Sequence, residues 1–134
     1  MQINEIYTEL LLKAEKDLNL SKLITTTESP DIENACYHSQ QCAEKAFKAF
    51  LIYSDIPFKH IHNLIILCHK CLEIDDSFSR FNLHCHVLNK YISFVRYFEV
   101  PELTINDMNE AIEYAEEILR FVNGKLKWLL MGLI

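Results

Sequence analysis

The sequence predicts an all-α protein, an antiparallel up-and-down bundle of four main helices plus one short helix. Apolar residues recur at intervals of three and four along most of the chain, which is the period of an amphipathic helix. Only 2 glycines and 3 prolines occur in 134 residues, too few for a fold rich in tight turns. Half of the residues are apolar, enough to bury a core without metal or disulfide staples. We therefore expect one helical domain over residues 1–134, with neighbouring long helices mostly antiparallel because their connections are short.

The first two helices are expected over residues 3–24 and 30–54. Apolar residues at 3, 6, 7, 10, 11, 14 and 18 form the stripe of the first helix. The threonines at 25–27 end it, because successive β-branched residues lose side-chain freedom in a helix. Ser29 is the expected N-cap of the second helix, and Pro30 is its first residue.

The stretch 37–52 organises the bundle. Three alanines, at positions 43, 46 and 49, lie on its apolar stripe and let a partner helix approach closely. Phe47 and Phe50 add larger apolar area. The opposite side is polar, and the spacing from Glu44 to Lys48 suits a favourable pair on an exposed face. We expect Glu44 to lie on that surface.

A short third helix and a longer fourth helix follow a loop at 55–59. The loop is expected because Pro57 disfavours helical geometry at the preceding residue. The third helix begins at Asn63, a good capping residue, and ends near Ile74. The fourth helix spans roughly residues 79–97. Its inward-facing residues are expected to be Leu83, Val87, Leu88, Tyr91, Phe94 and Val95.

The fifth helix opens at Thr104, where Asp107 completes a capping box in place of the usual glutamate. Gly124 is expected to end or kink this helix. Its apolar stripe is predicted to comprise Met108, Ala111, Ile112, Ala115, Ile118, Leu119 and Val122.

Charge and cysteine content narrow the range of functions. A formal net charge of −6 argues against sequence-independent binding of nucleic acid, which gains affinity from a basic surface. Five cysteines are an odd number, and no secretory signal opens the chain, so we expect reduced thiols and a cytoplasmic protein. No apolar run approaches the ~20 residues of a membrane span, so we expect no membrane partner. The candidates for a local basic patch are Lys45, Lys48, Lys59, His60 and His62.

Three motifs resemble those of the HEPN family. Residues 40–49 read Gln-Gln-Cys-Ala-Glu-Lys-Ala-Phe-Lys-Ala, which is similar to the Gln-Gln-x-x-Glu-Lys-x-x-Lys-Ala pattern of that family's central helix. The segment from His60 to Leu64 resembles its basic-x-His-x-Leu motif. The sequence Val-Arg-Tyr-Phe at 95–98 resembles its Arg-Tyr-Pro element, with Phe98 where the family usually has proline. The resemblance covers essentially the whole chain.

The resemblance implies a non-catalytic module that binds a nucleotide or a protein partner. Such proteins are often paired with a minimal nucleotidyltransferase in toxin–antitoxin type systems, and they form homodimers. No cofactor is expected. The ligand-binding residues are expected to be Gln41, Lys45, Lys48, His62, Arg96 and Tyr97, because cationic side chains grip phosphate. The alternative is structural: solvated lysines, a helix-capping His62, an Arg96 paired with a carboxylate and a packed Tyr97.

Two further constellations are considered. Nuclease members of the family resemble one another in an Arg-x4–6-His motif, and Arg80-x5-His86 fits it. In a metal-independent ribonuclease (an endoribonuclease toxin), His86 would act as general base and Arg80 would stabilise phosphate charge. The alternative is an ordinary helix surface.

Two cysteines at 68 and 71 and two histidines at 84 and 86 are ligand types that zinc uses. The cysteines lie on an apolar stripe and the histidines point apart on a helix, so no metal is expected.

Overall fold

The computed structural model describes residues 3–92 and 102–130, and every regular element in these ranges is helical. This confirms the predicted all-α fold class. In chain order, the elements are α1 (Ile3–Ile24), α2 (Ile32–Tyr53), α3 (Leu64–Ile74), the 3-10 helix η1 (Asp76–Phe81), α4 (Asn82–Leu88), the 3-10 helix η2 (Asn89–Tyr91) and α5 (Ile105–Leu130).

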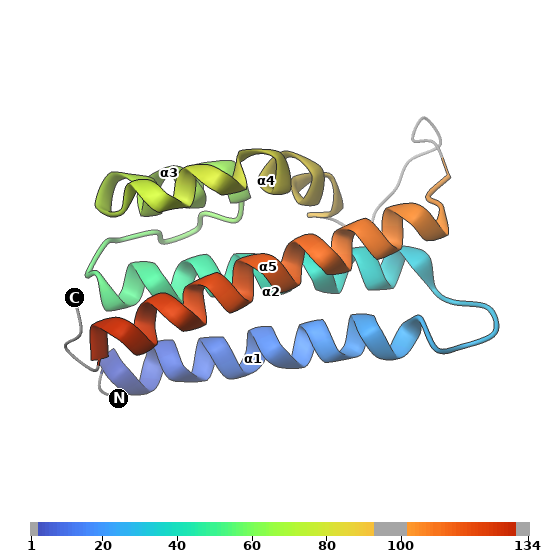
Figure 1. Cartoon of the computed structure of the whole chain (residues 1–134), viewed down its shortest axis with the longest axis horizontal. Helices are drawn as coiled ribbons and strands as arrows, with labels where there is room; N and C mark the ends of the chain where they lie inside the picture. The colour runs from blue at the N-terminus through green and yellow to red at the C-terminus, as the bar shows by residue number, and fades with distance from the viewer. Residues whose placement is uncertain (1–2, 93–101, 131–134) are drawn as a thin grey trace.

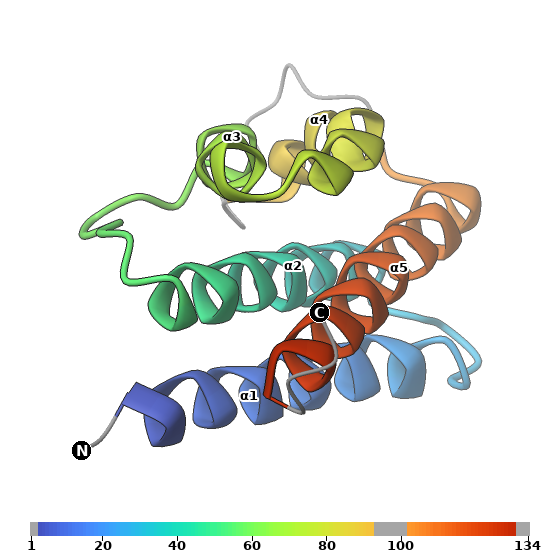
Figure 2. The same cartoon turned by 60° about the vertical axis from the view of Figure 1, so that its left-hand side comes forward.

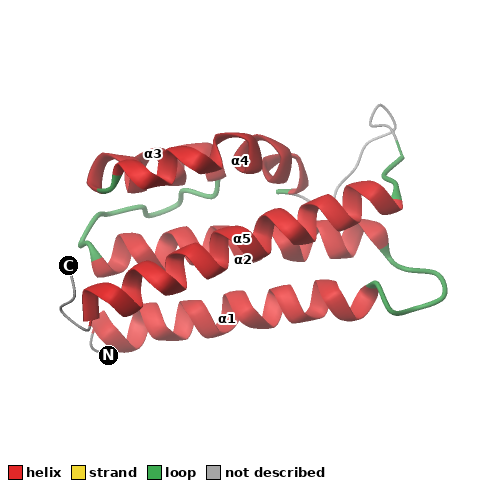
Figure 3. Ribbon diagram, in the orientation of Figure 1, coloured by secondary structure: helices red, strands yellow, loops and turns green. Residues whose placement is uncertain are grey.

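The helices form two layers. The long helices α1, α2 and α5 lie side by side, and the shorter α3 and α4 lie across the outer side of α2 and α5 (Figures 1 and 2). Helix α1 runs in the opposite direction to both α2 and α5 (Figure 1). Within the described residues, Figure 3 shows only helices and the loops that connect them. Among the described helices, none is both long enough and apolar enough to span a membrane.

Helix α2 is the centre of the fold, because α1, α5 and the short layer all pack against it. Ala43, Ala46 and Ala49 are completely buried, as expected for residues that admit a close partner helix. Burial extends beyond the apolar stripe, however. The side of α2 that we expected to be exposed is partly covered as well, and Glu44 is only 6% exposed. The prediction of a surface Glu44 is therefore wrong.

Helix α5 closes the bundle with the expected stripe, since all seven predicted inward residues are buried. Its capping box is also confirmed. The Thr104 N–H donates to Asp107 Oδ2 (2.7 Å), and the Asp107 N–H donates to Thr104 Oγ1 (3.2 Å). Gly124 does not end the helix, because α5 continues to Leu130. This glycine lies on the exposed side, and a Cβ there would meet nothing within 4 Å.

The predicted fourth helix is interrupted in its described part. Residues 76–91 form η1, α4 and η2 in succession, and residues 93–101 lie outside the described ranges, including Phe94 and Val95. Asp75 initiates the 3-10 turn by accepting the backbone N–H of Ser77 (3.0 Å). Phe78 and Phe81 are buried by this turn against Phe47. The resulting register leaves Leu83 60% exposed, so its predicted inward orientation is wrong.

The helix starts show which capping predictions hold. Asn63 caps α3 as expected, since its Oδ1 accepts the backbone N–H groups of Ile65 and Ile66. Helix α2 begins two residues later than predicted, and Asp31 replaces Ser29 as the N-cap. The Asp31 carboxylate accepts the Asn34 N–H (3.2 Å), and an acidic cap also suits the positive end of the helix dipole.

Candidate ligand-binding site

A buried carboxylate on α2 is the centre of the candidate site. Three side chains donate to Glu44: Gln40 through Nε2 (3.2 Å), Lys48 through Nζ (2.9 Å) and His62 through Nδ1 (3.0 Å). Burial alone would raise the pKa of Glu44, but the hydrogen bonds from Lys48, His62 and Gln40, together with the charge of Lys48, outweigh it and leave the pKa below its usual value. Glu44 is therefore ionised at neutral pH and holds the surrounding donors in place.

The loop between α2 and α3 brings His62 to this carboxylate. Asp55 and His60 have positive φ values of 59° and 64°, a conformation that Asp and His adopt more readily than most residues. These two positions bend the chain after α2 and again before α3. The loop thereby returns over the end of α2, and His62 reaches Glu44 while remaining 61% exposed. Phe58 lies beneath the Lys48 ammonium, with 5.5 Å between Nζ and the ring centroid.

An apolar hollow adjoins these charged groups. It has a volume of about 540 Å³ and is lined by Ile6, Ile52, Asp55, Ile56, Pro57 and Phe58. Phe58 belongs to both features, because its ring contacts Lys48 and also lines the hollow. The site therefore combines an aromatic ring, a cation and an accessible imidazole within one loop and the adjoining end of α2.

Gln41 and Lys45 occupy different positions relative to this cluster. Gln41 donates through Nε2 to Gln40 Oε1 (2.7 Å), which connects it to the hydrogen-bond network of Glu44. Lys45 instead pairs with Asp17 of α1, and the Asp17 carboxylate also contacts His38 Nδ1 (2.9 Å). Lys45 thus helps to hold α1 against α2. Arg96 and Tyr97 lie outside the described residues.

Arg80 lies in a separate cavity between the short layer and α5. This cavity of about 470 Å³ is lined by Arg80, Phe81, His84, Glu117, Arg120 and Phe121. The Arg80 guanidinium stacks on the ring of Phe121, 4.6 Å from its centroid, and its Nε donates to Ser77 O (3.1 Å). The lining includes His84 and does not include the exposed His86.

His84 is fixed by its neighbours inside that cavity. Its Nε2 contacts the Glu117 carboxylate, and its ring packs on Tyr114 with the centroids 4.3 Å apart. Its Nδ1 is buried without a hydrogen-bond partner among the described residues. The cavity therefore brings Arg80 together with His84, whereas the Arg-x4–6-His spacing selects His86.

Sequence reasoning missed two residues of the candidate site. Phe58 was assigned only to a loop, because a single aromatic residue there produces no periodic signal. Gln40 matched the family pattern, but we assigned it no role, whereas it is completely buried and donates to Glu44. Neither role could be found without knowing how the loop at 55–63 folds over α2.

Comparison with known proteins establishes the family. The HEPN domain pattern matches residues 7–125. The chain belongs to the HEPN domain family, and the resemblance of its central helix is confirmed.

Two relatives cover nearly the whole chain. A protein of Methanocaldococcus jannaschii named "Putative toxin MJ1304" is 33% identical over 142 aligned positions, which span 90% of this chain and 89% of that protein. The crystal structure of ST0689, described as an archaeal HEPN homologue, superimposes with a TM-score of 0.72 and 28% identity. That match covers 89% of this chain and 96% of the homologue. The similarity to ST0689 extends across the helical bundle.

Proposed function

We propose that this chain is a non-catalytic HEPN protein that binds a nucleotide at the loop between α2 and α3. The observation that supports this function is the position of Phe58, which lines the apolar hollow and also contacts Lys48. A nucleotide needs both an apolar face for its base and cationic donors for its phosphate. His62 supplies a second donor beside Lys48, and it is exposed enough to turn toward a ligand.

The proposed pose follows from these contacts. The base stacks on Phe58 in the hollow, where stacking on an aromatic side chain contributes roughly 1–3 kcal/mol. The phosphate lies at Lys48 and His62. Lys48 has three N–H donors, and its contact with Glu44 leaves others available for a phosphate oxygen. Glu44 fixes the ammonium in position before the ligand arrives.

The biological setting that we propose is a two-component system. The relative named as a toxin supports a toxin–antitoxin role, in which this chain acts as a cytoplasmic homodimer together with a minimal nucleotidyltransferase. In this proposal residues 1–134 function as one HEPN domain, and the bound nucleotide is the molecule shared with the enzyme partner.

Isothermal titration calorimetry with common ribonucleoside mono- and triphosphates tests the binding site. We expect Phe58→Ala to weaken binding about tenfold or more, because it removes the stacking surface. We expect His62→Ala to weaken binding of nucleotides and of ribose 5-phosphate alike, since it removes a phosphate donor. Lys59→Ala is the matched control, because Lys59 is an exposed cation on the same loop. Absence of nucleotide binding by the wild type, or equal affinity in Phe58→Ala, would contradict the proposal.

A metal-independent ribonuclease is the second candidate function. Arg80 lines a cavity together with a histidine and a second arginine, Arg120, and the relative named as a toxin also favours it. In this function Arg80 stabilises the phosphate, and a histidine accepts the proton of a ribose 2′-hydroxyl. The sequence motif assigns the base to His86, whereas the cavity contains His84.

RNA cleavage in the presence of EDTA separates these assignments. If Arg80 and His86 are catalytic, Arg80→Ala and His86→Ala lose activity, and His84→Ala keeps it. If the cavity is the active site, Arg80→Ala and His84→Ala lose activity, and His86→Ala keeps it. His69→Ala, on the exposed side of α3, serves as the control. Far-UV circular dichroism verifies that each variant is folded. If the wild type does not cleave RNA, the ribonuclease function is excluded and nucleotide binding remains the proposed function.

A further inference from the structure

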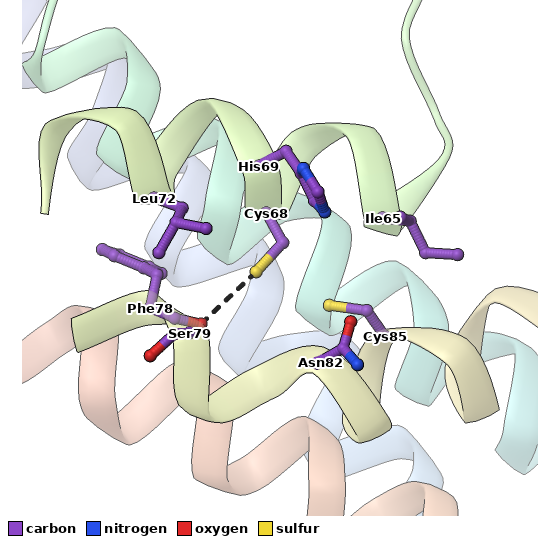
Figure 4. Close-up of a pocket in the computed structure, with 8 residues that line it drawn as sticks. All are labelled: Ile65, Cys68, His69, Leu72, Phe78, Ser79, Asn82 and Cys85. Atoms are coloured by element: carbon purple, nitrogen blue, oxygen red, sulfur yellow. Dashed lines mark hydrogen bonds between the residues drawn. The ribbon is translucent and has the colours of Figure 1, made fainter. Parts of the chain in front are cut away.

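Two thiols face each other across a pocket between the short helices. The pocket has a volume of about 200 Å³ and lies between α3 on one side and η1 with α4 on the other (Figure 4). Cys68 projects into it from α3, and Cys85 projects into it from α4 (Figure 4). The remaining lining consists of Ile65, His69, Leu72, Phe78, Ser79 and Asn82.

The two thiols have unequal environments. The neighbouring Cys85 thiol lowers the pKa of Cys68 and outweighs the opposing effect of burial. The same contact, together with burial, raises the pKa of Cys85. The Cys68 thiol also donates a hydrogen bond to the carbonyl oxygen of Phe78 (3.6 Å), and Cys68 is 6% exposed while Cys85 is 1% exposed. Cys68 is therefore the more accessible sulfur and forms a thiolate more readily.

The other three cysteines are in surroundings that disfavour reaction. Cys36, Cys42 and Cys71 are each completely buried. Burial is the largest cause that raises the pKa values of Cys42 and Cys71. Cys71 is close to Cys68 in sequence, but its sulfur points to the core and lies 3.8 Å from the Phe47 carbonyl oxygen. Buried thiols of this kind are inert.

We propose that Cys68 and Cys85 are a peroxide-sensitive dithiol that closes to a disulfide linking α3 to α4. The Cys68 thiolate attacks one oxygen of a hydroperoxide. The O–O bond breaks, the departing oxygen takes a proton and leaves as water or an alcohol, and Cys68 becomes a sulfenic acid. The Cys85 sulfur then attacks the Cys68 sulfur. An S–S bond forms, the S–O bond breaks, and the hydroxyl leaves with the Cys85 proton as water. The two thiols are oxidised by two electrons in total, and the peroxide is reduced.

The geometry makes this closure local. A disulfide needs its sulfurs about 2.05 Å apart. Cys68 and Cys85 line the same small pocket and enter it from adjacent helices, so closure needs only a local approach of α3 and α4 (Figure 4). The bond would hold α3 against α4 and so fix the short layer, which carries the Asn63 cap at its start and Arg80 in η1 between the two helices. It would involve none of the groups that bind Glu44, and it is independent of the proposed nucleotide site.

Treatment of the reduced full-length protein with hydrogen peroxide, followed by thiol alkylation and mass spectrometry, tests the proposal. We expect the wild type to lose two hydrogen atoms, to take up two fewer alkylating groups and to yield a cross-linked peptide pair containing residues 68 and 85. A fully reduced wild type would overturn the proposal. So would a cross-link between other positions, or a disulfide only between molecules on a non-reducing gel.

Serine variants separate the two sulfurs. In Cys85→Ser, oxidation should stop at a Cys68 sulfenic acid, which dimedone captures, because the thiol that would form the disulfide is absent. Cys68→Ser should lower the rate of peroxide-dependent thiol loss by at least about tenfold. Cys71→Ala is the matched control on the same helix and should still form the cross-link. Equal rates of thiol loss in Cys68→Ser and the wild type would overturn the assignment of Cys68 as the attacking thiol.

Discussion

Glu44 shows how one buried charge can serve both stability and binding. Its carboxylate is held by Gln40, Lys48 and His62, and Lys48 and His62 are also the donors that we propose for the ligand phosphate. Removing one partner of a buried ion pair costs far more than replacing both partners with apolar groups, because the remaining charge is left without compensation. The stability of α2 and the arrangement of the phosphate donors therefore depend on the same carboxylate.

Lys48→Met should destabilise the protein by about 3 kcal/mol, because it leaves the Glu44 carboxylate buried with fewer donors. The double variant Glu44→Leu with Lys48→Met should recover most of that loss. Urea denaturation of the wild type, the two single variants and the double variant measures the coupling. A Lys48→Met protein as stable as the wild type would show that the pair contributes little.

The pH dependence of stability provides a second measurement on the same residue. The pKa of Glu44 is lower in the folded protein than in the unfolded chain. Its stabilising contribution is therefore complete above the unfolded pKa, about 4.3, and is lost as the pH falls through the lower folded value. In Glu44→Gln the free energy of unfolding should fall less steeply below pH 4.3 than in the wild type. An identical slope would contradict the direction of this shift.

At the scale of the element, the stability of the short layer depends more on caps, turns and packing than on the length of its helices. Helix α3 has 11 residues and α4 has 7, and helices this short are marginal in isolation. They are fixed by the Asn63 cap, by the Asp75 turn and by aromatic packing of η1 on α2. Both candidate sites and the cysteine pocket include residues of this layer or of the loop that leads into it.

Asn63→Ala should lower the free energy of unfolding by about 1 kcal/mol, because two backbone N–H groups of α3 lose their acceptor. Asn19→Ala is the matched control, since Asn19 lies on the exposed side of α1, where alanine is a better helix former. Thermal or urea unfolding measures both variants. Equal stability of the two variants would show that Asn63 does not contribute as a cap.

At the scale of the whole molecule, the sequence predicted the long helices and the core stripes well. Periodicity is a local property, so the apolar stripe of α5 and the close-packing alanines of α2 could be found from spacing alone. The burial of Glu44 could not, because His62 and Gln40 compensate its charge only after the loop has folded over α2. A charged residue normally indicates a surface until such partners are known.

The interrupted fourth helix and the candidate sites were harder to predict for similar reasons. Phe78 and Phe81 are three residues apart, a spacing that fits an α-helix and a 3-10 helix equally well. The motif spacing selected His86, whereas the folded turn brings His84 to the cavity of Arg80. Lys48 and His62 both contact the buried Glu44 carboxylate, and this shared contact could be found only from the structure. The ligand roles of all these residues stay predictions.

The central position of α2 also bears on how the protein is made. A ribosome delivers α1 and α2 first, and α5 is the last of the described helices to emerge, yet α5 covers a whole side of α2. Until then, apolar residues of the growing chain remain in contact with water, a condition in which nascent proteins aggregate or recruit chaperones. Completion of the bundle therefore requires α5, and the Arg80 cavity, which α5 lines with Glu117, Arg120 and Phe121, takes its final form only after α5 has docked.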